Sequence, residues 1–447
     1  MLAKKDIVNF LFVISFPVYG LGSYVTGYIS PSIGSIVSVV PLVLILIFFF
    51  IDSLYKRSLN FGGGSLYLIA TLLLLLCCYS LYVAYKNQIP FYSRWVMIGN
   101  IALTIIPYNA FIPVLLYNGT DVKKVIRLTF VGISILLMLN LVGFYGLGIA
   151  NAVHSIEGRI NFPFIDSFYS GSALAIVISL MLLFYMKRLR AEPIKFMGML
   201  LYLFLNLAII FMINSRLQVL IFLVTILVFT FGPGAKSKFV FFTSLFFVPL
   251  LLNFSLLVYK ILSLPAMEAI LVRVSKEDVT TFHGRAQLWQ AAIDWLINDQ
   301  TGIWFGNGYK GHVLLHLLDF EAKVRWHVPT YNMHLHSTAF ELLTSTGVVG
   351  YALFVVMMYK TFLYFRQRYA DETPEAIFMP IMFFLIWVLQ IDLIVYLGSW
   401  GNIILSLMWA MVTVGASRKK AGLEIPVSLK VTPGMDNGAR RESVNQY

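Results

Sequence analysis

The residues best suited to chemistry are concentrated between His283 and His336. This window holds six of the seven histidines of the 447-residue chain and four of its eight tryptophans. It also contains Arg285, in the string Gly284-Arg285-Ala286-Gln287-Leu288-Trp289. Imidazole is the natural general base near neutral pH, and a guanidinium presents a planar fork that matches phosphate oxygens. The window therefore suggests base catalysis beside a bound phosphate.

A metal site is the competing interpretation of the same histidines. His312 and His316 have the i, i+4 spacing of helical zinc ligands, and His334 and His336 alternate. However, the chain contains no His-Glu-x-x-His string and no Asp-x-Asp pair. We therefore expect no metal ion and no other cofactor.

The rest of the chain is suited to a bilayer. It is 59% hydrophobic and 12% charged, whereas soluble proteins carry roughly 25% charged residues. Apolar runs of about 20 residues, the length that spans a bilayer core, recur along the chain. They predict an all-α polytopic membrane protein of about 12 transmembrane helices in one bundle. The expected spans lie roughly at 7–28, 33–52, 65–85, 95–117, 128–150, 168–186, 196–214, 217–232, 239–262, 337–363, 374–397 and 401–417.

These spans divide the chain into four regions. Helices one to nine occupy 1–262, a long external loop occupies 263–336, helices ten to twelve occupy 337–417, and 418–447 form a disordered basic tail. Within the long loop, 285–297 and 311–326 read as short helices, separated by a turn at 305–308. In the first of them Leu288, Trp289, Ala292, Ile293 and Leu296 share one face.

Basic residues set the orientation. With the N-terminus inside, 22 of the 33 lysines and arginines lie on or near the inner side, as the positive-inside rule requires. Both termini are then cytoplasmic and the long loop is external. The same rule explains much of the net charge of +12, and no aromatic-basic RNA-binding motif accompanies it, so no nucleic-acid partner is expected.

Three further polar residues lie on or near the external side. Arg216 follows Ser215 at the corner between the seventh and eighth spans, and two arginines suit a diphosphate. Arg159 lies in the external segment 151–167, and Asp392 is a carboxylate inside the eleventh span, where charge is rare. Each has a plainer alternative. Arg216 and His336 also fit as residues at the membrane interface, and Asp392 fits as a helix–helix hydrogen-bonding residue.

Several strings together resemble the O-antigen polymerase and ligase superfamily. They are Gly284-Arg285-x-x-x-Trp289, Phe305-Gly306-x-Gly308, His336 with Gly347 eleven residues later, and the Ser215-Arg216 corner. The sequence departs from the family pattern at Ser337, where asparagine is common, and at Ser345, where glutamate is common. Both departures leave the acceptor type open.

The resemblance implies a GT-C-like, metal-independent, inverting glycosyltransferase of the bacterial inner membrane. Its donor would be a polyprenyl-diphosphate-linked glycan, with Arg216 and Arg285 holding the diphosphate and His336 activating the acceptor hydroxyl. The acceptor would be a glycan or glycolipid. Candidate contacts to acceptor or glycan are Arg159, Trp289, His334 and Asp392. Membrane lipids, a flippase and a chain-length regulator are candidate partners.

Three functions are compatible with this pattern. An external site has little access to cytosolic nucleotide sugars, so a donor already carried across on a lipid diphosphate fits it. A repeat-unit polymerase is favoured, because the departures from the family pattern lie in the histidine motif and the polymerases are the more varied group. A ligase that moves finished glycan to lipid A-core or to protein is the alternative. A transporter of lipid-linked oligosaccharide is more distant, because transporters carry charge at the bilayer midplane and show internal repeats.

Overall fold

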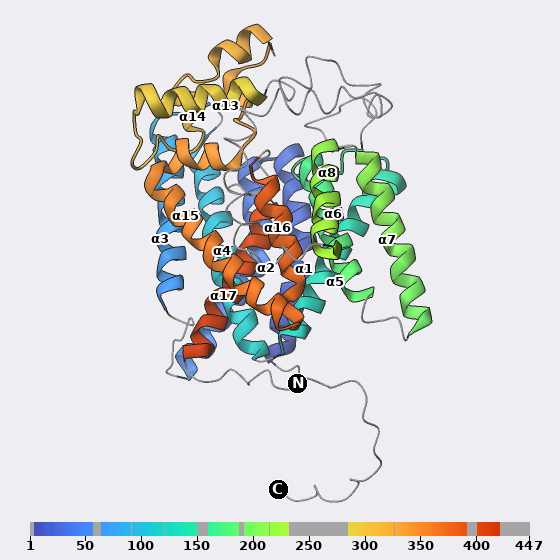
Figure 1. Cartoon of the computed structure of the whole chain (residues 1–447). Helices are drawn as coiled ribbons and strands as arrows, with labels where there is room; N and C mark the ends of the chain where they lie inside the picture. The colour runs from blue at the N-terminus through green and yellow to red at the C-terminus, as the bar shows by residue number, and fades with distance from the viewer. Residues whose placement is uncertain are drawn as a thin grey trace, which may run out of the picture.

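The structure is a computed structural model that describes residues 4–56, 64–90, 92–119, 121–149, 160–186, 192–213, 215–231, 285–325, 327–390 and 400–420. These residues form a bundle of helices with a smaller helical layer over one end (Figure 1). No β-strand occurs in the described ranges. The expected span at 239–262 lies outside them, as does the end of the expected span at 374–397.

Eight of the described helices are long and apolar enough to cross a membrane. They are α1 (Lys4–Tyr28), α2 (Pro31–Tyr55), α3 (Ser65–Lys86), α4 (Arg94–Asn118), α5 (Val122–Leu141, extended by a π turn to Gly146), α6 (Phe168–Met186), α7 (Pro193–Ile213) and α15 (Thr338–Ala370). Shorter apolar stretches lie in α8 (Arg216–Phe231), in Pro374–Val388, which ends as α16 (Phe378–Val388), and in α17 (Trp400–Lys420). The protein is therefore an all-α polytopic membrane protein, as its apolar runs predict.

Polar caps explain where several helices begin. The side chain of Ser93 accepts from Val96 N–H at the start of α4, and Asp121 accepts from Lys124 N–H at the start of α5. Ser337 does the same for α15, with its Oγ 3.4 Å from Phe340 N. Each cap satisfies a backbone donor that the first helical turn leaves without a partner.

Small residues allow α1 and α2 to pack closely. A side chain at Gly22 of α1 would overlap Ser38 of α2, and one at Gly34 of α2 would overlap the backbone of Thr26. Between membrane helices, close backbone approach replaces the hydrophobic driving force that water supplies in soluble proteins. The pair therefore depends on these glycines for its spacing.

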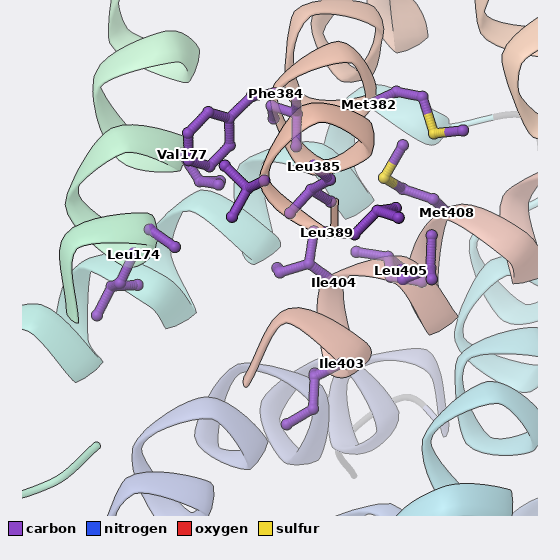
Figure 2. Packing of buried hydrophobic residues seen from close by; sticks show 14 of the residues in the cluster. Leu174, Val177, Met382, Phe384, Leu385, Leu389, Ile403, Ile404, Leu405 and Met408 are labelled. Carbon is purple, nitrogen blue, oxygen red and sulfur yellow. The ribbon is translucent and has the colours of Figure 1, made fainter. Parts of the chain in front are cut away.

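The core is apolar where α6, α16 and α17 meet. Val177 of α6 lies beside Phe384 of α16, and Met408 of α17 lies near Leu389, the residue that follows α16 (Figure 2). All of these side chains are buried. The packed core fixes the helices whose ends carry the polar residues described below.

The two ends of the bundle differ in chemistry. At one end, Asp52 of α2 pairs with Lys4 and with Lys56, and accepts from the Tyr117 hydroxyl of α4 at 2.8 Å. The opposite end carries the cap, by which we mean residues 285–336 except residue 326. The cap contains α13 (Arg285–Asp294) and α14 (Gly311–Leu314), drawn at the top of Figure 1. It is tied to the C-terminal half of α3, because Tyr309 N–H donates to Ser80 O at 2.9 Å.

Candidate active site

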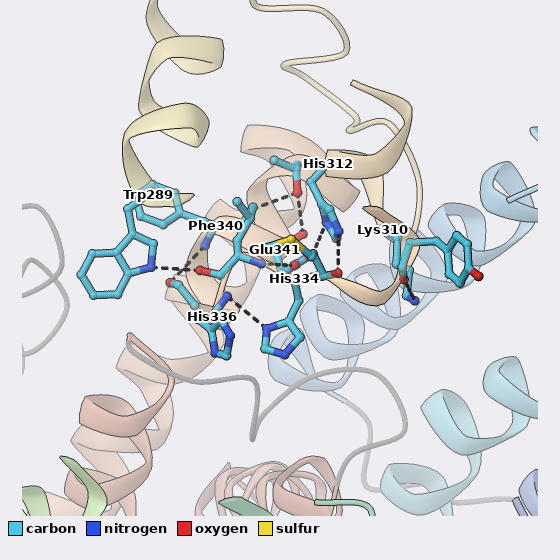
Figure 3. A network of polar contacts seen from close by, with 12 residues as sticks. Trp289, Lys310, His312, His334, His336, Phe340 and Glu341 are labelled. Carbon is cyan, nitrogen blue, oxygen red and sulfur yellow. Dashed lines mark hydrogen bonds and ion pairs between the residues drawn. The ribbon is translucent and has the colours of Figure 1, made fainter. Parts of the chain in front are cut away.

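His336 lies at the junction between the cap and α15. Its backbone is left-handed, with φ at 48°, and its N–H donates to Nδ1 of His334 at 3.2 Å. The two imidazole rings are 3.8 Å apart between centroids, and the ring of Tyr169, near the start of α6, lies 6.4 Å from His336. Because Nδ1 of His334 accepts, the proton of a neutral His334 ring is on Nε2. The junction thus holds two half-buried imidazoles side by side, next to α6 (Figure 3).

Leu335, the residue before His336, is held through both of its backbone polar groups. Leu335 N–H donates to Oε1 of Glu341 in α15 at 2.7 Å. Leu335 C=O accepts from the indole N–H of Trp289 in α13 at 3.0 Å. Trp289 and Leu335 have no exposed surface, and Glu341 is 1% exposed. Two helices far apart in sequence therefore fix the two peptide units that flank Leu335, α15 the unit that joins it to His334 and α13 the unit that joins it to His336.

A buried histidine–carboxylate pair extends this network (Figure 3). His312 of α14 is completely buried, and its Nδ1 lies 3.1 Å from Oε2 of Glu341. Its other ring nitrogen, Nε2, lies 3.0 Å from Met333 C=O. A carbonyl oxygen can only accept, so Nε2 must carry a proton and donate it. Cap residues 333 and 335 are thereby both anchored to the pair of His312 and Glu341.

Three glycines lock the cap onto α15. At Gly347 the helix is broken, with φ at 69° and ψ at −174°. A side chain there would overlap the backbone of Trp304 and Phe305, and a side chain at Gly306 would overlap Ser345 O. A Cβ added at Gly311 would lie only 2.6 Å from Thr344 O. Close backbone contact of this kind requires residues without a Cβ.

Four backbone hydrogen bonds join the same two segments. The N–H groups of Val348 and Val349, freed by the break, donate to Ile303 O at 2.8 Å and Trp304 O at 3.1 Å. In the other direction, Asn307 N–H donates to Thr344 O at 2.8 Å and Gly308 N–H to Ser345 O at 3.2 Å. The Phe305-Gly306-x-Gly308 string and Gly347 are therefore two halves of one contact.

Lys310 adds a cation to the inner part of the cap. Its ammonium donates to Tyr331 C=O at 2.7 Å, and burial lowers the pKa of this lysine below its ordinary value, although the charge of Glu341 opposes the shift. The backbone of Lys310 is left-handed, with φ at 57°. Its side chain ties the turn before α14 to the segment that leads to His334.

The two arginines expected at the site each begin a helix. Arg216 is the first residue of α8 and Arg285 the first of α13, while their side chains lie outside the described part of the structure. The end of α7, which precedes Arg216, approaches the start of α6, since the Cβ of a residue at Gly171 would lie 3.6 Å from Ile213. Arg285 lies one turn before Trp289. Both helix starts are thus toward the end of the bundle that carries His336.

The remaining expected contacts divide into two groups. Arg159 and Asp392 lie outside the described residues. His334 accepts the N–H of His336, and Trp289 is buried with its N–H directed at Leu335 O. The expected apolar face of the first loop helix is present, because Leu288 and Ala292 are buried together with Trp289.

The expectation of a helix over 311–326 is wrong. Gly311–Leu314 form one short α-helix, turns occupy 315–318, and a separate helical stretch covers 319–325, of which Glu321–Arg325 are π-helical. His316 has φ at 55°, a left-handed conformation that ends a helix. As a result His312 points into the core while His316 is 78% exposed, so the two do not share a face as metal ligands would. Within the described residues no group of three or more potential metal ligands converges.

The sequence patterns do not predict the buried pair of Glu341 and His312. Glu341 lies in the string that follows His336, in the first turn of an apolar helix. A carboxylate at such a place indicates a buried polar partner, because burying it without one is costly. No spacing rule identifies His312 as that partner, since the two are 29 positions apart.

The comparisons with known proteins concern one segment of the chain. Residues 201–355 match the family model described as O-antigen ligase. No curated protein matches the chain. The matched segment begins within α7, runs through the cap and ends within α15, and it includes Arg216, Arg285, His336 and Gly347. This segment of the chain is therefore similar to the O-antigen ligase family.

Proposed function

We propose that the protein transfers a glycan from a polyprenyl-diphosphate donor to a saccharide hydroxyl on the outer face of the bacterial inner membrane, during synthesis of a surface polysaccharide. One observation carries the proposal. The family segment 201–355 contains a histidine at a constrained junction and two arginines that begin α8 and α13 toward the same end of the bundle. Such a set can bind a diphosphate and deprotonate a hydroxyl.

In the proposed reaction, His336 takes the proton of the acceptor hydroxyl as its oxygen attacks the anomeric carbon of the donor sugar. The bond between that carbon and the diphosphate oxygen breaks, and the configuration inverts. Arg216 and Arg285 bind the diphosphate and offset the negative charge that it gains as it leaves. Both charges are supplied by side chains, so this scheme uses no metal ion. His334, Arg159 and Asp392 are the proposed contacts to the acceptor or glycan.

The acceptor distinguishes two versions of this function. We favour a polymerase that joins repeat units, with a flippase and a chain-length regulator as its proposed partners. The alternative is a ligase that transfers finished glycan to lipid A-core or to protein, and the family match is compatible with both versions. The departure at Ser337 does not discriminate between them, because serine caps α15 there and asparagine is an equally good capping residue.

The test is complementation of a strain that lacks the gene with Arg216→Ala, Arg285→Ala and His336→Ala. Each variant should abolish polymer or ligated glycan while the protein still inserts at normal levels. Matched controls are Arg94→Ala, an exposed arginine at the start of α4, and His316→Ala, an exposed histidine of the cap, and both should complement. Complementation by all three site variants would refute the assignment.

The glycans of the deletion strain separate the two versions. Single repeat units on the acceptor indicate that a polymerase was lost. Full-length chains that remain on the carrier lipid indicate that a ligase was lost.

A further inference from the structure

The strongest unassigned feature of the structure is the buried network beneath the histidine junction. It consists of Trp289, His312 and Glu341, which come from α13, α14 and α15. None of the three is a residue of the proposed reaction, and all are almost completely buried. A buried ionisable pair is costly to maintain unless both members are hydrogen-bonded. Its persistence here requires a reason beyond packing.

The bonds of this network end on the backbone that carries the two junction histidines. Glu341 accepts from Leu335 N–H at 2.7 Å, Trp289 donates to Leu335 C=O at 3.0 Å, and His312 lies 3.0 Å from Met333 C=O. Leu335 separates His334 from His336, so the peptide unit that joins it to each histidine is held by one of these bonds. Downstream, Thr338 N–H donates to Leu389 O at 2.8 Å, which holds the other side of His336.

Such support is needed because His336 is strained. A non-glycine residue with φ at 48° is uncommon and costs about 1 kcal/mol or more, so it persists only where the surroundings hold it. A free loop would relax to an extended conformation and carry the imidazole away. Catalytic groups must be held to within about 0.5 Å, and a 1 Å displacement can cost roughly 100-fold in rate.

We propose that Trp289, Glu341 and His312 are positioning residues, which set the place of the His336 imidazole by holding the Leu335 peptide and the Met333 carbonyl. This inference rests on the proposed function, because it takes His336 as the base. The essential property of Glu341 is hydrogen-bonding geometry rather than charge. One proton lies between its Oε2 and Nδ1 of His312, whichever atom carries it, and neither atom faces substrate.

Glu341→Gln and Glu341→Leu form the first test pair, because the two replacements are similar in size. A glutamine can accept from Leu335 N–H with its carbonyl and donate its amide N–H to Nδ1 of a neutral His312, so every bond of the network survives. A leucine makes none of these bonds. We expect Glu341→Gln to keep kcat within about threefold of wild type and Glu341→Leu to lower it by at least about tenfold, with a smaller change in KM for the donor.

Trp289→Phe and Trp295→Phe form the second pair. Both tryptophans are buried in the same stretch of the cap, and each donates its indole N–H to a carbonyl at 3.0 Å, that of Leu335 for Trp289 and that of Thr301 for Trp295. The same substitution therefore removes the same kind of bond, once beside His336 and once away from it. We expect a kcat loss of about tenfold for Trp289→Phe and less than about threefold for Trp295→Phe.

The measurements use the full-length protein purified in detergent, with lipid-linked glycan extracted from the deletion strain as donor, and with thermal unfolding recorded for every variant. Equal losses of kcat for Trp289→Phe and Trp295→Phe would overturn the inference, since a general loosening of the cap would then suffice. It is also overturned if Glu341→Gln is as inactive as Glu341→Leu, which would make the carboxylate itself necessary. His336→Ala separates the two levels. Full activity of that variant refutes the proposed base, whereas its inactivity alongside fully active Trp289→Phe and Glu341→Leu refutes only the positioning role.

Discussion

Replacement of Gly347 by alanine is the sharpest test of how the cap is attached. At φ 69° and ψ −174°, Gly347 occupies a region of backbone space that only glycine populates readily. An alanine Cβ would also overlap the backbone of Trp304 and Phe305, which cannot move aside as a flexible side chain could. Gly347→Ala therefore forces either a strained, overlapping contact or withdrawal of the cap from α15.

The structure bounds the cost of this change. Local withdrawal of residues 303–308 from 344–349 loses the four backbone hydrogen bonds between them, at roughly 1 kcal/mol each and about 4 kcal/mol in total. Keeping the contact costs about 1–3 kcal/mol of backbone strain, to which the overlap adds. Because the protein takes the less costly of these two routes, the free energy of this contact falls by at most about 4 kcal/mol, or about 1,000-fold in its closed-to-open ratio.

Limited proteolysis of the cap in purified protein measures that ratio, because cleavage follows the open population when opening is fast. We expect Gly347→Ala to be cut in the cap at least about tenfold faster than wild type and to lose glycan transfer. The matched control is Gly198→Ala in α7, where a Cβ meets nothing within 4 Å. Buried Cys77, probed with a thiol-reactive dye during heating, reports whether the bundle itself stays folded. Wild-type protease resistance and activity in Gly347→Ala would refute the glycine contact as the attachment of the cap.

Three further predictions follow from individual contacts. Ser337→Ala should destabilise the start of α15 by about 1 kcal/mol, whereas Ser337→Asn should change its stability by only about a few tenths of a kcal/mol. Hydrogen exchange of residues 338–346 measures both, and equal exchange in the two variants would count against Ser337 as the N-cap residue of α15. Burial acts to raise the pKa of Asp319, but hydrogen bonds from Thr330 and His316 outweigh it and hold this pKa below its ordinary value of 3.8. A depressed carboxylate pKa stabilises the fold fully above 3.8 and less as pH falls through the folded value. Exchange in 316–330, corrected for its intrinsic pH dependence, should therefore accelerate below that pH in wild type, and Asp319→Asn should not show this component. Finally, the purified enzyme should keep its activity after extended chelation, whereas activity lost to chelator and restored by a divalent cation would contradict the metal-free scheme.

The membrane helices could be predicted from the sequence because the bilayer sets their length and composition. The expected starts of α2, α3 and α4 lie within two residues of those in the structure. A local pattern of this kind needs no knowledge of the partner surface. Likewise, the apolar face around Leu288 and Trp289 predicts the first loop helix, because that face is periodic.

The cap could not be predicted in the same way, because its shape depends on pairs that are distant in sequence. The predicted helix over 311–326 is interrupted, because His312 is buried against Glu341 and His316 has a left-handed backbone conformation. Neither feature has a periodic signal in the sequence. The glycine strings could be recognised by resemblance alone. The segments that carry Gly306 and Gly347 pack against each other through the turn at 305–308 and the break in α15, and this contact has no signal in the sequence.

The glycine contacts and the bond from Leu335 to Glu341 both act on one short helical segment, residues 338–346, which lies between His336 and the break in α15. Glycine contacts hold its far end to the turn at 305–308, and Glu341 near its start holds Leu335. Displacement of the segment would therefore move the Leu335 peptide, and with it His336, even without a change near the imidazole. The position of the histidine is thus set by three separate stretches of sequence, in α13, in the turn through α14, and in α15. This dependence supplies a physical reason why a glycine eleven residues after a histidine, and a Phe-Gly-x-Gly turn some thirty residues before it, belong to one motif. It also predicts that the effects of Gly347→Ala and Trp289→Phe on kcat are not additive, because both act on the position of one side chain.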